Sequence, residues 1–418
     1  MNKYLYIILS IAIAGTAHAE VKNVDVTSLT VPVMINREYN PVMGLTVVSD
    51  NTPAEITGIT VLVKKNKPQD IDKITIHKSL LEKNGSPRMQ SQGTGAGEII
   101  GSASGNEITS GSVLIKMNHK LEQGNNYLWI SITPSKRAPV RGSFDLEIPS
   151  LKTGNSVVSI DNAQAVQRIG YAITTPNQEV SIIKAETGEV IRKRNSQYFR
   201  IPTITRTLKG TLIVTFDNRY NHNGDLPADI DVATSRSTDG GQTWSPITTC
   251  INAADIPGIG QGVGDSCILL DHKTGRVWVA ALAAPKSGHP IWTSSTGTTS
   301  PEKCGQLVLA YSDDDGITWS KPINITESVK RLNNPETASW GCLFDGPGNG
   351  LCMRNGTLVF PAQIWGEKHM GVLVYSKDHG KTWTSSRPME FGGSESQVVE
   401  LSDGSLLMNT REGAGGLR

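Results

Sequence analysis

The sequence predicts an all-β protein. Gly supplies 42 and Pro 21 of the 418 residues, and long stretches are rich in Val, Ile and Thr, a composition that favours short strands and tight turns. A turn-forming pattern of eight residues also recurs three times in the second half of the chain. With 37% apolar and 19% charged residues the chain can fill ordinary cores, and its length predicts two or three domains at roughly 150 residues each.

The charge balance argues against two classes of partner. Lys and Arg together number 40 against 39 for Asp and Glu, so the net charge is +1. Such a balance provides no excess of positive charge that would attract nucleic acid or an anionic membrane surface. We therefore expect neither of these as a partner.

Residues 1–19 have the layout of a secretory signal. Lys3 is followed by an apolar run over 4–14 and by Ala17-His18-Ala19, which predicts cleavage after Ala19 and export to the periplasm or the medium. An uncleaved membrane anchor is the alternative, but the run is shorter than the roughly 20 residues that cross a bilayer. No later segment is long and apolar enough to span a membrane, so we expect a soluble mature protein.

The five cysteines all lie in the second half of the chain. Export permits disulfides, but the odd count leaves at least one thiol unpaired, and the spacings fit neither a metal site nor a Cys-x-x-Cys motif. We expect mainly core residues and at most two disulfides among Cys250, Cys267, Cys304, Cys342 and Cys352.

Residues 20–168 are predicted to form a β-sandwich, because short alternating apolar runs are separated there by polar turns. A Gly- and Ser-rich stretch over 90–105 is predicted as a loop. A carbohydrate-binding module and a structural spacer both fit this domain. The predicted strands are 29–35, 44–48, 59–63, 71–76, 113–117, 127–133 and 144–148.

Residues 185–418 are predicted to form a β-propeller. The pattern S-x-D-x-G-x-T-W recurs at 237–244, 312–319 and 376–383, each time after a strand-like run, and a turn motif repeated at this interval is typical of propeller blades. The box Asp should accept hydrogen bonds from turn N–H groups, the Gly should adopt permissive backbone angles, and the Trp should pack between blades.

Two further patterns are interpreted as structural. The acidic run Asp313-Asp314-Asp315 lacks the ligand spacing and closing Glu of an EF-hand loop, so we interpret it as a turn. The glycines between 258 and 264 do not match a dinucleotide-binding fingerprint and predict a flexible loop.

Three motifs around the first box point to a known family. Tyr198-Phe199-Arg200-Ile201-Pro202 is followed by Asp217-Asn218-Arg219-Tyr220 and by Asn223-Gly224-Asp225-Leu226-Pro227. This sequence resembles the bacterial exo-α-sialidases (neuraminidases), and closely those secreted by Bacteroides-type bacteria with an N-terminal β-sandwich. The resemblance covers about 189–411 and implies a six-bladed propeller. It also implies retaining hydrolysis of terminal α-linked sialic acid on glycoproteins, glycolipids and oligosaccharides, without metal or organic cofactor.

The resemblance assigns three arginines to substrate binding. Sialic acid carries a carboxylate on its anomeric carbon, and the planar, permanently charged guanidinium binds a carboxylate with two parallel hydrogen bonds. Arg200 matches the first member of the family's arginine triad and Arg411 the second. Arg219 matches an arginine on the hydroxyl side of the sugar ring. A salt bridge between blades is the alternative role for Arg200.

The resemblance also assigns the groups that transfer protons. Asp225 matches the acid/base aspartate that protonates the leaving oxygen and then activates water. Asp229 and Asp231 are rivals, but they alternate like the start of a strand. Glu395 matches the glutamate that acts as base towards a nucleophilic Tyr, which approaches the anionic anomeric centre without charge. Glu400 is the alternative to Glu395.

Two residues have less specific matches. Asp265 resembles an aspartate near the N-acetyl and ring-hydroxyl pocket. Gln363 is a candidate to face the glycerol side chain, and a role as a polar residue at a strand end explains it equally well.

The resemblance places the third arginine and the nucleophilic Tyr after Arg411, in the last blades. We therefore expect about four of six blades in residues 185–418, and no more than trace turnover by the 418-residue form. A sialoglycan-binding protein or inactive fragment without turnover is the alternative. Another glycosidase with Asp boxes and two carboxylates is disfavoured by the Arg-Ile-Pro motif at Arg200.

Overall fold

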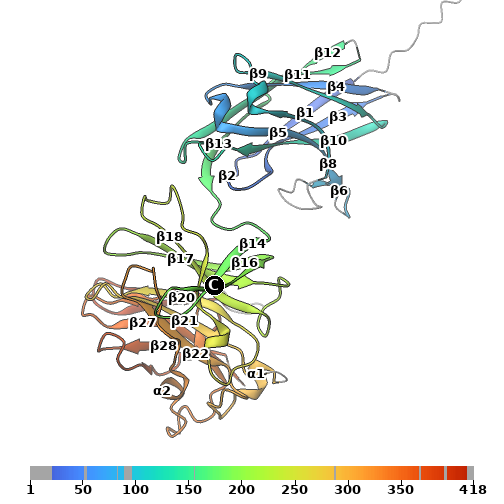
Figure 1. The fold of residues 1–418 in the computed structure, drawn as a ribbon. Coiled ribbons are helices and arrows are strands. Elements are labelled where there is room, and N and C mark those ends of the chain that lie inside the picture. The colour runs from blue at the N-terminus through green and yellow to red at the C-terminus, as the bar shows by residue number, and fades with distance from the viewer. Residues whose placement is uncertain are drawn as a thin grey trace, which may run out of the picture. The chain divides into compact units, whose positions relative to one another are not determined.

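The computed structural model describes residues 21–50, 54–81, 83–88, 97–154, 156–286, 289–366, 369–389 and 393–411. The chain divides into two compact units, Met1–Ala172 and Ile173–Arg418 (Figure 1). The predicted signal sequence lies outside the described residues. Within the described part, the helices are too short or too polar to cross a membrane.

The first unit is the predicted β-sandwich. Its five-stranded sheet has the order β1 (Val21–Ser28), β3 (Asn40–Ser49), β10 (Gly124–Pro134), β5 (Ile71–Lys78) and β8 (Glu98–Ser104). The facing sheet has the order β2 (Val33–Ile35), β13 (Gln164–Tyr171), β11 (Ser143–Thr153), β4 (Glu55–Val63) and β9 (Ser112–Lys120), with β12 (Ser156–Ser159) beside β11. A small hairpin joins β6 (Leu80–Leu81) and β7 (Pro87–Arg88).

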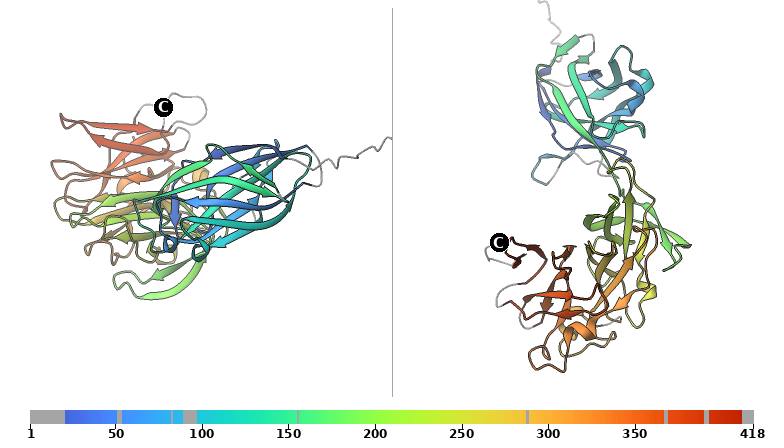
Figure 2. Two further views of the ribbon diagram at one scale, coloured as in Figure 1. Left: turned by 90° about the horizontal axis from the view of Figure 1, so that it is seen from above. Right: turned by 90° about the vertical axis from the view of Figure 1, so that its left-hand side faces the viewer.

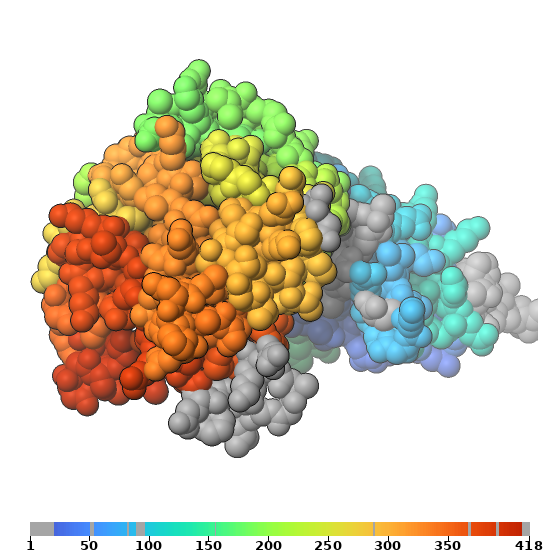
Figure 3. All heavy atoms as spheres, turned by 90° about the horizontal axis from the view of Figure 1, so that it is seen from below, coloured from blue at the N-terminus to red at the C-terminus, as the bar shows by residue number. Residues whose placement is uncertain are grey.

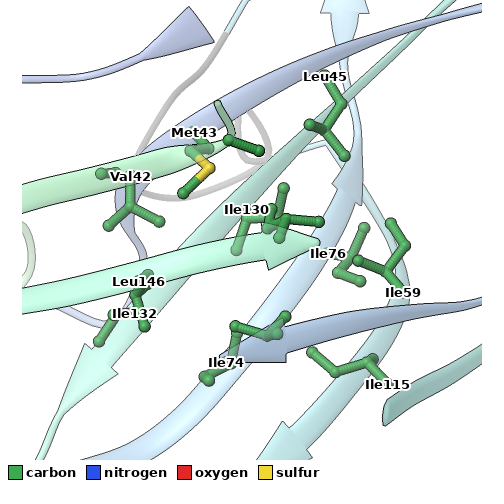
Figure 4. Close-up of a cluster of buried hydrophobic side chains, with 14 of the residues drawn as sticks. Val42, Met43, Leu45, Ile59, Ile74, Ile76, Ile115, Ile130, Ile132 and Leu146 are labelled. Carbon is green, nitrogen blue, oxygen red and sulfur yellow. The ribbon is translucent and has the colours of Figure 1, made fainter. Parts of the chain in front are cut away.

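Alternating side chains from both sheets fill the core of this unit. Figure 4 shows Val42, Leu45, Ile76 and Ile130 of the five-stranded sheet facing Ile59, Ile115 and Leu146 of the other sheet. All seven are at most 2% exposed. Successive side chains of a strand point to opposite faces, and this period of two is clearest along β9 and from Met43 to Ser49 of β3. Figure 2 shows the unit from two further directions.

The structure differs from the sequence predictions at the 90–105 loop and at the start of the second unit. The stretch over 90–105 is not one loop, because residues 98–104 form β8, which pairs with β5 through a bulge. The second unit begins at Ile173 instead of residue 185, because β14 (Gln178–Ile183) pairs with β15 (Val190–Ser196) and with β19 (Thr248–Ile251).

The second unit is a succession of mainly antiparallel sheets. The first runs β15, β14, β19, β18 (Ile230–Ser237), β17 (Leu212–Arg219) and β16 (Tyr198–Arg206). The second runs β23 (Ile323–Asn324), β22 (Gln306–Ser312), β21 (Val277–Ala283), β20 (Val263–Leu270) and β25 (Gly348–Asn349). The third runs β24 (Cys342–Asp345), β27 (Leu358–Trp365), β28 (Met370–Ser376) and β29 (Thr384–Ser385), with β26 (Leu351–Cys352) on β27. β30 (Ser396–Glu400) pairs with β31 (Leu406–Thr410).

This succession has the topology of propeller blades. Strands β16–β19, β20–β23 and β27–β29 pair in chain order as antiparallel neighbours, and β20 contacts both β16 and β24. β14 joins β19, and β25 joins β20, by parallel pairing. The short helices α1 (Ile291–Ser294) and α2 (Thr326–Lys330) lie in the connections. In the space-filling view, the yellow to red segments of this unit pack side by side (Figure 3). The number of blades in the complete ring stays a prediction.

The three Asp boxes form the predicted turns. Asp239 accepts hydrogen bonds from the N–H groups of Gln242 and Thr243, and the second box repeats both bonds around Asp314. In the third box Asp378 accepts the bond from the Thr382 N–H. The box glycines have φ values of 82° to 89°, which a side chain would oppose. The buried Trp383 lies edge-on to Trp278 of the preceding blade at 5.6 Å, so this box Trp packs between blades.

The residue after the box Asp reaches the preceding blade. Asp315 accepts hydrogen bonds from Thr211 and from Arg236 at 2.9 Å. His379 lies 2.9 Å from the buried carboxylate of Asp271. Asp313 binds Arg276 with two bonds of 2.7 Å. The acidic run is therefore a turn, as the sequence predicted, and two of its aspartates have arginine partners.

The five cysteines are buried and free, and no disulfide is found in the described part of the chain. The prediction that they are core residues is confirmed.

Candidate active site

Arg200 is presented by a bulge in β16. The pairing with β17 shifts register between Arg200 and Thr203, and Ile201 has a φ of 53°, which is unfavourable for a β-branched residue. Pro202 then fixes the next backbone angle. The bulge leaves the Arg200 side chain 40% exposed, and its Nη1 donates to Oδ1 of Asp225 at 3.0 Å. A strained backbone at this point is typical of a functional site.

Arg219 ends β17 and is buried. Its Nε and Nη2 donate to Oδ2 of Asp217 at 3.2 and 2.8 Å, and its Nη1 donates to Oδ1 of Asp225 at 2.7 Å. Asp217 and Arg219 share a strand face because they are two residues apart. Both side chains are 1% exposed, so the pair is a buried ion pair beneath the loop of Asp225.

The two arginines hold the loop that carries Asp225. Besides the carboxylate, Nη1 of Arg219 binds the main-chain oxygens of Asn223 and Gly224 at 3.0 and 2.9 Å. The hydrogen bond from Arg219, aided by the charge of Arg200, holds the pKa of Asp225 below its usual range. Its side chain is nevertheless 75% exposed, so a ligand can reach it.

Asp265 lies beside this group on a second bulge. The pairing of β20 with β21 shifts register between Gly264 and Cys267, and Asp265 has a φ of 58°. Its N–H donates to Oδ1 of Asp217 at 2.8 Å. Burial, followed by the charge of Asp217, raises the pKa of Asp265 to about 7. Burial likewise raises the pKa of Asp217 to about 6 against the opposing effect of Arg219.

Two acidic residues of this site, Asp217 and Asp345, had no predicted role. Asp217 is the buried partner of Arg219, and its i, i+2 spacing within Asp217-Asn218-Arg219 was the signal that could have found it. Asp345 ends β24, is fully buried, and has no hydrogen-bond partner for either carboxylate oxygen among the described residues. Burial, then the charges of Asp265 and Asp217, raises the pKa of Asp345 well above its usual value. No local pattern in the sequence marked Asp345.

Glu395 and Arg411 form a separate pair at the ends of the β30–β31 hairpin. Nη1 of Arg411 donates to Oε2 of Glu395 at 2.6 Å, and the Arg411 N–H donates to the Glu395 carbonyl at 2.8 Å. The charge of Glu395 contributes to the raised pKa of Asp265, so the two carboxylates are close enough to interact electrostatically. Both side chains of the pair are about half exposed and therefore accessible to a ligand.

Gln363 and Arg219 have little surface for a ligand. Gln363 is 1% exposed, accepts a bond from Trp365 Nε1 at 2.6 Å and donates to the carbonyl of Asp345. Direct contact of Gln363 or Arg219 with a sugar therefore stays a prediction. In the described part of the chain, no group of three or more His, Cys, Asp or Glu side chains could hold a metal ion.

The raised pKa of Asp265 predicts a pH-dependent stability. Between the usual aspartate value and about 7, the folded protein binds more protons than the unfolded chain, so stability falls as pH rises through this window. We expect the melting temperature of the wild-type protein to fall between pH 5 and pH 8, and to fall less in Asp265→Asn, which cannot ionise. Parallel pH slopes of wild type and variant in thermal unfolding would contradict this assignment.

The fold and the site define an Asp-box β-propeller preceded by a β-sandwich, with arginines and carboxylates gathered on its first blades. Residues 201–418 match the family model of the BNR repeat-like domain, and residues 21–156 match that of the N-terminal domain of BNR-repeat neuraminidase. The chain therefore belongs to the BNR-repeat sialidase (neuraminidase) family.

Individual relatives agree with this assignment. The sialidase of Bacteroides fragilis is 36% identical over 323 residues, which are 75% of this chain and 56% of that protein. The sialidase of Clostridium perfringens is 37% identical over 230 residues, or 54% of this chain and 58% of that protein. The solved Hadza microbial sialidase Hz136 has a TM-score of 0.75 and 30% identity, covering 94% of this chain and 76% of its own. The chain thus spans little more than half the length of these two curated relatives.

Proposed function

We propose that the protein is an exo-α-sialidase that hydrolyses terminal α-linked sialic acid from glycoproteins, glycolipids and oligosaccharides with retention of configuration. The observation that supports this most strongly is the cluster in which Arg200 and Arg219 converge on the exposed carboxylate of Asp225. In a member of the sialidase family, such a cluster supports a role in binding the substrate carboxylate and in proton transfer. We further propose that the protein is exported, as its first 19 residues predict.

Arg200 and Arg411 would bind the substrate carboxylate. Both guanidinium groups are partly exposed, and each is currently paired with a carboxylate of the protein. A substrate carboxylate would replace Asp225 at Arg200 with a similar charge-assisted hydrogen bond, worth about 1.5 to 3 kcal/mol. The pairing of Arg200 with Asp225 supports the proposal that an anionic ligand binds at Arg200, while Arg411 keeps its bond to Glu395.

Displacement from Arg200 would prepare Asp225 for catalysis. In the ligand-free geometry the arginines keep this carboxyl ionised, whereas a general acid must carry a proton. Losing one of its two arginine partners, in a site that the bound sugar shields from water, would raise the pKa of Asp225. The protonated carboxyl would then donate to the glycosidic oxygen and afterwards activate a water molecule.

Glu395 would serve as the base towards a nucleophilic Tyr, with Arg411 orienting its carboxylate through the 2.6 Å bond. We assign no nucleophile within the described residues. Asp265, whose pKa burial raises to about 7, would in its protonated form donate a hydrogen bond to a polar group of the ring substituents.

Calorimetry with the sialic acid analogue 2-deoxy-2,3-didehydro-N-acetylneuraminic acid tests the binding role of Arg200. We expect Arg200→Lys to weaken binding at least tenfold although the charge is kept, because an ammonium cannot form two parallel bonds to a carboxylate. Arg206→Lys is the matched control, since Arg206 is exposed at the other end of β16. Equal affinities of Arg200→Lys and wild type would remove Arg200 from the carboxylate site.

A further inference from the structure

A second ion pair closes the base of the loop that carries Asp225. The carboxylate of Asp229 accepts bonds from Nη1 and Nη2 of Arg194 at 3.1 and 2.6 Å. Nδ2 of Asn221 donates to the same carboxylate at 3.0 Å, and the N–H of Tyr220 donates to the Asp229 carbonyl at 3.2 Å. Both ends of the 221–228 segment are therefore tied to each other and to Arg194.

Arg194 makes these contacts from β15, which lies at the far edge of the first sheet from β16. Its guanidinium stacks over the ring of Tyr220 at 3.5 Å, and the Tyr220 hydroxyl donates to the buried Asp231 at 2.8 Å. A planar guanidinium can stack on a ring and bind a carboxylate with two bonds at once, whereas an ammonium cannot. The contact is therefore specific for arginine.

The loop thus has two fixing points. Arg219 holds its tip through Asp225 and the carbonyls of Asn223 and Gly224, and Arg194 holds its base through Asp229. A substrate carboxylate at Arg200 would remove one contact of the tip but would leave the base unchanged. The direction in which Asp225 approaches the leaving oxygen then depends on the base.

We propose that Arg194 and Asp229 form a clasp that positions Asp225 for proton transfer. This inference rests on the proposed function, because it assigns to the clasp a part in the same reaction. Arg194 and Asp229 are positioning residues, and Asp229, a sequence-level rival of Asp225 for the acid role, is engaged by Arg194 instead.

Steady-state kinetics of Arg194→Lys in the full-length natural protein test the clasp. We expect kcat on a sialyl-oligosaccharide, which has a poor leaving group, to fall about 10- to 100-fold with KM within about twofold. An aryl sialoside, which needs little protonation, should lose less than about threefold. Lys193→Gln is the matched control: it breaks the exposed 2.8 Å ion pair with Glu179 on the same hairpin and should leave kcat unchanged.

A double-mutant cycle separates positioning from general loosening. In an Asp225→Ala background, Arg194→Lys should cause no further loss of kcat, because the group that it positions is absent. Equal losses in both backgrounds, equal losses on both substrates, or an unchanged kcat of Arg194→Lys would overturn the inference.

Amide hydrogen exchange of residues 219–230 gives a readout that does not need turnover. We expect faster exchange in Arg194→Lys than in wild type and Lys193→Gln. Faster exchange together with a wild-type protein that releases no sialic acid would overturn the proposed function. Normal wild-type turnover with unchanged exchange and kcat in Arg194→Lys would overturn the clasp alone.

Discussion

Arg219→Met is expected to destabilise the second unit by about 3–5 kcal/mol, the range typical of removing one partner from a buried ion pair. Arg219 and Asp217 are each 1% exposed, and two of the guanidinium nitrogens bind the Asp217 carboxylate. Methionine keeps much of the side-chain volume but leaves Asp217 without its counter-charge. Urea unfolding of the second unit, monitored through the hydrogen exchange of its strands, measures the loss of unfolding free energy.

Two comparisons define this prediction. Arg200→Met removes an exposed arginine from the same Asp225 carboxylate and should cost less than about 1 kcal/mol, because it leaves no buried charge. Adding Asp217→Asn to Arg219→Met should recover part of the loss by removing the unpaired carboxylate. A loss below about 1 kcal/mol in Arg219→Met would show that the buried pair does not support the fold.

Asp225→Asn in the full-length natural protein is expected to lower kcat on a sialyl-oligosaccharide by about 10²- to 10⁴-fold, the usual contribution of a general acid. Asparagine keeps an oxygen that can accept bonds from Arg200 and Arg219, but it cannot deliver a proton. Aryl sialosides should lose much less, because their leaving groups are stable as anions. Steady-state rates on the two substrates measure the difference.

Asp255→Asn serves as control for Asp225→Asn. Asp255 is an exposed carboxylate at the end of η4 (Ala253–Asp255) and makes no contact with the arginine cluster in the described structure. It should show wild-type rates on both substrates. Equal losses on both substrates in Asp225→Asn would exclude Asp225 as the acid.

The elements that local patterns encode were predictable from the sequence. Each Asp box carries its own turn chemistry within eight residues, and the strict alternation in segments such as Ile59–Val63 identifies a half-buried strand. Strand β14 fell between the two predicted domains, 20–168 and 185–418, because its place in the first sheet depends on a pairing with β19, some 65 residues further along the chain.

In the site, too, residues within contiguous motifs could be predicted and contacts between distant segments could not. The motifs around Arg200 and Asp225 are contiguous, so they could be recognised, and the structure brings both residues together. The burial of Asp345 and the pairing of Arg194 with Asp229 depend on contacts between distant segments, which leave no local signature. The enclosure of Arg219 by Asp217 and the loop carbonyls, which leaves it little surface for a sugar, likewise has no local signature.

The stereochemistry of the released sugar tests the proposed function most directly. Proton NMR of the full-length natural protein with a sialyl-oligosaccharide follows the anomers of sialic acid as they appear. A retaining exo-α-sialidase releases the α-anomer first, and the β-anomer accumulates only later through mutarotation. We predict this order. The appearance of the β-anomer first, or no release of sialic acid at all, would contradict the proposal that this site is a retaining sialidase centre.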